Sequence, residues 1–153
     1  MDLKTHQELT AALSDYTTAI TLAPSARYHI DRAFIYDALG EHEQAIEDIA
    51  VAMKTDLSGF SRVQLERART IQEAYLEYYG ASASALGVYG TILTRMGEDV
   101  PALDAYSTAI GLDPDPDEWY VARGALYTRS GDLESAIGDY SSAIDLIPTD
   151  VTL

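Results

Sequence analysis

The side chains that most often carry chemistry are few and scattered in this sequence. Its three histidines, His6, His29 and His42, have no metal-ligand spacing that would place two of them on one helix. The run from Asp113 to Asp117 alternates aspartate with proline and resembles the start of a calcium loop, but Glu118 stands where such a loop needs glycine. We therefore interpret this run as a proline turn followed by a helix N-cap, and we expect no metal site and no cofactor.

Motifs for nucleophilic or phosphate chemistry are also missing from the sequence. There is no cysteine, no Gly-x-Ser-x-Gly elbow and no glycine loop that could hold a phosphate. Pairs of carboxylates are frequent, but a chain this acidic forms such pairs by composition alone. The sequence predicts no catalytic residues and favours a protein that is not an enzyme.

The charge of the chain narrows its classes of partner. Of 153 residues, 25 are Asp or Glu and 10 are Lys or Arg, so the net charge is −15. This charge opposes binding to nucleic acid and to anionic membrane surfaces. No apolar run approaches the ~20 residues that span a bilayer, and the N-terminus lacks the pattern of a signal peptide. With no cysteine as well, a cytoplasmic location is expected.

A period of about 34 residues runs through the chain. Three glycines, Gly40, Gly97 and Gly131, each precede an alanine by five residues. Each alanine is followed by a large residue four positions later and by another alanine after three more. These positions are Ala45, Ile49 and Ala52, then Ala102, Tyr106 and Ala109, then Ala136, Tyr140 and Ala143, and in the N-terminal stretch Ala12, Tyr16 and Ala19. This spacing forms one stripe of an α-helix, and a glycine before it suits the left-handed end of a preceding helix.

These repeats resemble the tetratricopeptide repeat (TPR) family. The closest match to the family pattern is carried by Arg123, Gly124, Tyr127, Gly131, Ala136, Tyr140, Ala143 and Pro148. Ala33 and Leu57 replace the helix glycine and the closing proline of an earlier unit. The resemblance implies an all-α fold, a right-handed α-solenoid of antiparallel helix pairs with about eight helices.

The repeat positions divide the single domain into five segments. These are a half repeat at 1–25, a repeat at 26–59, an inserted helix at 60–82, and repeats at 83–116 and 117–150. In the first segment, Leu3 and Lys4 are expected to form the last turn of a first helix, ahead of the second helix. The insert is expected to be one helix from near Ser61 to near Gly80. It is either a connector packed on the solenoid or a joint that changes the direction of the superhelix.

Two charge pairs lie at equal distances on either side of a turn glycine. Arg32 and Asp48 are each eight residues from Gly40, and Arg123 and Asp139 stand in the same relation to Gly131. Residues equally far from the turn of an antiparallel helix pair should lie side by side. We expect two partly buried structural ion pairs, since an unpaired charge at such a place would be costly.

Binding, as the resemblance implies, would use the groove lined by the first helix of each repeat. The expected ligand is a peptide or protein segment, preferably basic, held by shape, apolar pockets and charge sign. The outward-pointing candidates are Arg27, Ile30, Asp31, Phe34, Asp37, Val88, Thr91, Thr94, Arg95, Val121, Thr128 and Arg129.

The terminal helices support an alternative function. The first helix has no complete partner and the last, which contains Ile137 and Ile144, has no helix after it in the sequence. The chain is then a fragment of a longer solenoid, a scaffold that associates with itself through its ends, or a protein that tolerates frayed ends.

Overall fold

The computed structural model describes residues 2–55 and 59–147, which fall into two compact units. Unit 1 is Met1–Gly80 and unit 2 is Ala81–Leu153. Leu57 and Pro148, which the repeat pattern places at the ends of two units of sequence, lie outside the described residues, as do Met1 and the end of segment 117–150.

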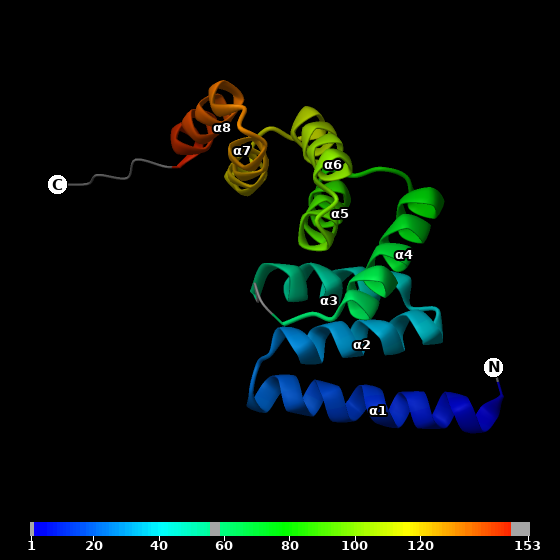
Figure 1. The fold of residues 1–153 in the computed structure, drawn as a ribbon. Helices are drawn as coiled ribbons and strands as arrows, with labels where there is room; N and C mark the ends of the chain where they lie inside the picture. The colour runs from blue at the N-terminus through cyan, green and yellow to red at the C-terminus, as the bar shows by residue number, and fades with distance from the viewer. Residues whose placement is uncertain (1, 56–58, 148–153) are drawn as a thin grey trace. The chain divides into compact units, whose positions relative to one another are not determined.

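The described residues form eight α-helices, and the chain is all-α there (Figure 1). Unit 1 contains α1 (Leu3–Leu22), α2 (Ala26–Leu39), α3 (His42–Thr55) and α4 (Arg62–Tyr79). Unit 2 contains α5 (Ala83–Met96), α6 (Asp99–Leu112), α7 (Asp117–Ser130) and α8 (Leu133–Leu146). The pairs α2/α3, α5/α6 and α7/α8 are the repeated element, and every helix in them has 14 residues.

The turn inside each helix pair depends on glycine. Gly40, Gly97 and Gly131 have φ angles of 82°, 79° and 84°, in the left-handed region that other residues avoid. The residue after each glycine donates its backbone N–H to a carbonyl five positions back, as Asp132 does to Tyr127. This is the Schellman arrangement that satisfies the last carbonyls of a helix. The three glycines therefore fix the same turn in all three pairs.

Helix α4 corresponds to the predicted insert. Ser61 caps its start in a capping box with Gln64, and Gly80 follows its last residue. Within unit 1, α4 packs on both α3 and α2. It therefore occupies the place relative to the α2/α3 pair that α7 occupies relative to α5/α6, since α7 packs on both of those helices.

Helix α1 differs from the sequence expectation. Leu3 and Lys4 do not end a separate helix, because Leu3–Leu22 is one continuous helix. Asp2 caps it by accepting a hydrogen bond from the backbone N–H of Thr5 at 2.8 Å. No glycine or proline interrupts this stretch of sequence, so the helix extends back to the cap.

The alanine stripes form the core of each unit. Ala45, Ala52, Ala102 and Ala109 are completely buried between helices. In unit 2 the core also contains Tyr106 of α6 and Trp119 of α7, which belong to one buried cluster. Gly87 allows this packing, since the indole of Trp119 occupies the space where a Cβ would stand. Small residues at these points let neighbouring helices approach, and the aromatic rings fill the remaining space.

Candidate functional site

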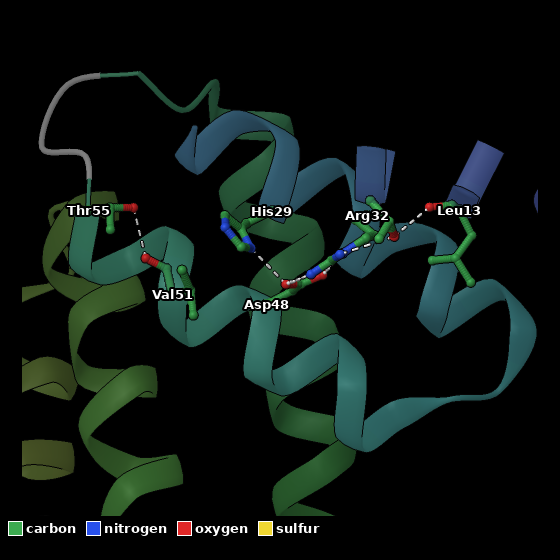
Figure 2. A network of polar contacts seen from close by, with 7 residues as sticks. Leu13, His29, Arg32, Asp48, Val51 and Thr55 are labelled. Atoms are coloured by element: carbon green, nitrogen blue, oxygen red, sulfur yellow. Dashed lines mark hydrogen bonds and ion pairs between the residues drawn. The ribbon is translucent and has the colours of Figure 1, made fainter. Parts of the chain in front are cut away.

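Asp48 of α3 is the centre of a polar cluster in unit 1 (Figure 2). Arg32 of α2 donates to it twice, from Nε to Oδ2 at 2.7 Å and from Nη2 to Oδ1 at 2.8 Å. His29 Nδ1, one turn earlier on α2, lies 2.8 Å from Asp48 Oδ1. Arg32 Nη1 also donates to Thr17 Oγ1 of α1 at 3.1 Å. The arginine therefore joins three consecutive helices.

The same arrangement recurs in unit 2. Arg123 of α7 donates from Nε and Nη2 to the two carboxylate oxygens of Asp139 on α8, at 2.9 and 2.7 Å. Its Nη1 donates to Ser107 Oγ of α6 at 3.0 Å. Both carboxylates are buried and both arginines are mostly buried. The two ion pairs expected from the turn glycines are thus present as two-bond contacts, the strong geometry for Arg and carboxylate.

These clusters are suited to holding helices together. The hydrogen bonds that Arg32 donates to Asp48 raise the pKa of Arg32, and those that Arg123 donates to Asp139 raise the pKa of Arg123, so both guanidiniums stay charged. All three nitrogens of each guanidinium donate to side chains of the protein.

The hydroxyl partners Thr17 and Ser107 are not identified by the sequence analysis. Each lies on the helix before the one that carries its arginine. Counting equal distances on either side of a turn glycine relates only the two helices of one pair, so it does not reach them. A signal exists in the repeat itself, because Thr17 and Ser107 each follow an equivalent alanine, Ala12 or Ala102, by five residues.

The predicted groove residues of unit 1 are largely covered by α4. Ile30 is completely buried and does not point outward, which corrects the expectation for that residue. Arg67 of α4 lies over the ring of Phe34, 4.3 Å from its centroid, and donates from Nη2 to the Phe34 carbonyl at 3.1 Å. Gln64 Nε2 lies 3.4 Å from an oxygen of Asp31. The side chain of Asp37 is 3.5 Å from His42, and Arg27 is exposed.

The predicted groove residues of unit 2 are more open. Val88 is the exception: it is buried, again contrary to expectation. Thr91 and Thr94 are half-buried and donate their hydroxyls to carbonyls one turn back in α5. Arg95 is also half-buried, while α7 exposes Val121, Thr128 and Arg129.

Arg129 forms an exposed ion pair across the helix pairs of unit 2. Its Nε donates to Asp99 Oδ2 at 2.7 Å, and its Nη2 contacts the other carboxylate oxygen. Asp99 begins α6, so this pair ties the end of α7 to the start of α6. The groove candidates of α2 and those of α5 and α7 belong to separate units, so each set is a surface of its own.

Unit 1 has a further pocket of about 410 Å³ near the end of α4. Three tyrosines line it together with His42 of α3. The rings of Tyr75 and Tyr79 stack with centroids 4.7 Å apart, and Tyr78 meets Tyr79 edge-on at 4.8 Å. The rings therefore pack mainly on one another, as tyrosines at helical spacing usually do.

Residues 2–55 and 59–147 contain no group of three or more His, Asp or Glu side chains that could hold a metal ion. Across the same residues, no helix combines the length and the apolar character that crossing a membrane requires.

The antiparallel pairs of 14-residue helices, in each of which a left-handed glycine forms the turn between the two helices, define a helical-repeat protein. A tetratricopeptide repeat model matches residues 101–151. Residues 101–151 therefore carry a tetratricopeptide repeat, and the structural likenesses below are likenesses of fold. A search of the curated proteins finds no match.

Several solved structures share the fold over nearly the whole chain. A crystal structure of MamA is 19% identical, with a TM-score of 0.54, and the match covers 95% of each chain. A second MamA, from Desulfovibrio magneticus RS-1, is 16% identical with a TM-score of 0.53, covering 94% of this chain and 88% of that one. YrrB, described as a TPR protein with an unusual peptide-binding site, is 20% identical with a TM-score of 0.54, covering 97% of this chain and 82% of that one. At these identities the likeness is one of fold.

Proposed function

We propose that this chain is a non-catalytic interaction module that binds a peptide or protein segment along the first helices of unit 2, α5 and α7. The observation that carries the proposal is the open face of α7, where Ala125, Thr128 and Arg129 are all exposed. The corresponding face of α2 in unit 1 meets side chains of α4. The resemblance to tetratricopeptide repeats implies that first helices face the ligand, and YrrB, which shares the fold, is described as having a peptide-binding site.

The charge of the C-terminal half favours a basic segment. From Glu98 to the end of the chain there are 12 acidic residues and only two arginines, a local charge of −10. Both arginines are already paired, Arg123 with Asp139 and Arg129 with Asp99. The negative electrostatic potential of this half should raise the association rate of a cationic partner and disfavour acidic competitors.

The absence of catalysis is part of the same proposal. Catalytic groups with perturbed pKa values usually gather in one pocket. Among the described residues, the groups with shifted pKa values lie at helix caps, in the two arginine clusters and at the tyrosines of two separate units: Asp2, Asp132, Arg32, Arg123, Tyr16 and Tyr106. They support stability rather than a reaction centre.

A matched pair of threonines tests the proposal. Thr128 of α7 and Thr108 of α6 are both exposed, and each donates its hydroxyl to the carbonyl one turn back in its own helix. Short peptides selected on the native chain from a random library serve as probes. Thr128→Arg should weaken their binding by adding charge and bulk to the proposed face, whereas Thr108→Arg adds the same charge to a second helix and should not.

Self-assembly through the terminal helices is a second candidate function, because α8 exposes a row of apolar side chains. A scaffold of this kind gains mass with concentration in sedimentation, whereas a groove binder does not. A peptide-binding monomer at all concentrations would favour the first proposal and exclude the second.

A further inference from the structure

Helix α8 leaves open a face that the equivalent helices keep covered. Ile137 and Ile144 are 66% and 65% exposed, and Tyr140 between them is 36% exposed. The equivalent tyrosine of α6, Tyr106, is only 2% exposed. The exposed row extends over the whole helix at alternating spacings of four and three, the pattern of a helix-packing seam: Leu133, Ile137, Tyr140, Ile144 and Ile147.

The other second helices show what covers this face. In α6, Leu103 and Ile110 pack against the cluster that contains Trp119 of α7. In α3, Ile49 and Met53 are buried, and α4 packs on this helix. In both cases the cover is the single helix that follows the pair, which is α7 of the next repeat for α6 and the inserted helix α4 for α3.

An open position on α7 indicates the same missing neighbour. Val121 is 46% exposed, although Ile30 of α2 and Gly87 of α5 are buried at the same place, the fifth residue of each helix. Helix α2 packs on α4 and α5 packs on α7. A helix laid on α8 in this register would reach Val121 as well.

A hydroxyl on the open face specifies one residue of the missing helix. Thr17 and Ser107 accept from Arg32 and Arg123, which are the seventh residues of α2 and α7. The equivalent position of α3 is Ala50, and the seventh residue of α4, which covers α3, is Ala68. A hydroxyl at this position is thus met by an arginine of the covering helix, and an alanine at this position is met by an alanine. Helix α8 carries a hydroxyl, Ser141, at this position.

We infer that the exposed face of α8 is a docking site for a basic amphipathic helix of another protein, which binds as the first helix of a further repeat would and places an arginine against Ser141. The sign of its charge follows from α8, which exposes Glu134 and Asp145 and contains no Lys or Arg, whereas Asp139 is buried against Arg123. Burial of the apolar row supplies most of the driving force, and the arginine fixes the register.

A second copy of this chain would bury the apolar row without placing an unpaired arginine against Ser141. Only α2 and α7, among the described helices, carry arginine at the seventh position. Arg32 and Arg123 are already held by Asp48 and Asp139 inside their own repeats. This site lies on α8 and shares only Val121 of α7 with the proposed groove on α5 and α7, and it does not depend on that proposal.

The test uses a peptide that imitates the helix covering α6. Its sequence is that of Asp117–Ser130 with Asp117→Lys and Glu118→Lys, and a lactam bridge on its outer face keeps it helical, because an isolated helix of this length is marginal. Fluorescence anisotropy with the full chain should give saturable binding in the micromolar range. Ile137→Glu on α8 should weaken binding by at least about tenfold, whereas Val100→Glu, an equally exposed apolar site on α6, should not.

A double-mutant cycle tests the register. Ser141→Ala should weaken binding of the arginine peptide several-fold but leave a peptide with Arg123→Ala unchanged. Three results would overturn the inference. The first is a binding curve that does not saturate at about 1 mM peptide, since weaker affinity would not count as specific binding. The others are equal binding to the Ile137→Glu variant, and a dimer of the free chain that Ile137→Glu dissociates.

Discussion

Arg123 Nη1 donates a hydrogen bond to Ser107 Oγ at 3.0 Å, and this bond links the second helix of one repeat to the first helix of the next. The other donors of Arg123 hold Asp139 within its own repeat. One guanidinium therefore stabilises both the helix pair and the junction between pairs. Arg32 does the same for Thr17 and Asp48 in unit 1.

Removal of Arg123 is expected to be costly. Arg123→Ala leaves the Asp139 carboxylate buried without its partner, so the free energy of unfolding should fall by about 3 kcal/mol. Arg129→Ala removes an exposed pair with Asp99 and should cost less than about 1 kcal/mol. Urea unfolding followed by circular dichroism measures both. Equal stability of the Arg123→Ala variant and the native chain would refute the structural role of the pair.

The bond across the junction should be measurable by itself. Ser107→Ala removes the acceptor of Arg123 and should lower the free energy of unfolding by about 1 kcal/mol. Thr108→Ala is the control, since the Thr108 hydroxyl bonds only within its own helix. In a double-mutant cycle, Ser107→Ala should cost little once Arg123→Ala is present. Fully additive losses would show that the two side chains do not interact.

Gly87 and Gly138 should respond in opposite directions to alanine. A Cβ at Gly87 would stand 2.6 Å from Cε2 of Trp119, so the indole must move and stability should fall by about 1–3 kcal/mol. A Cβ at Gly138, in the middle of α8, meets nothing within 4 Å, so Gly138→Ala should stabilise by about 0.5–1 kcal/mol. Thermal unfolding of the two variants checks the packing of α5 on α7. A neutral Gly87→Ala variant would contradict it.

Burial of Tyr106 should make the chain sensitive to alkali. Burial raises the pKa of Tyr106 above its ordinary value of 10.0, so its folded-state pKa is above the unfolded one. Its contribution to stability is therefore complete below pH 10.0 and is lost as the pH rises through the folded-state pKa. Tyr106→Phe cannot ionise and should lose less stability across this window. Parallel declines in the two proteins would argue against a buried phenol.

The sequence predicts the parts of this structure that depend on neighbours within one repeat. The turn glycines fix the helix pairs, and reflection about them identifies Arg32 with Asp48 and Arg123 with Asp139. The same period, with the capping box at Ser61, locates α4. These features follow from local geometry that every repeat shares.

Features that depend on packing between repeats are not accessible in this way. Ile30 and Val88 occupy groove positions in the family pattern, yet both are buried, because burial there depends on whether another helix follows. The contacts of Thr17 and Ser107 with arginine also lie between repeats, so the pattern within one repeat does not predict them. The continuity of α1 was also mispredicted, since the repeat pattern suggests a turn that the residues near Lys4 do not form.

The most direct test of the proposed function compares peptide affinity for two arginine variants. Peptides selected on the native chain are titrated by calorimetry into the native chain, Thr128→Arg and Thr108→Arg at low salt. We expect Thr128→Arg to weaken binding by at least about tenfold and Thr108→Arg by less than about twofold. Equal affinities for all three proteins would contradict binding on the open face of α7.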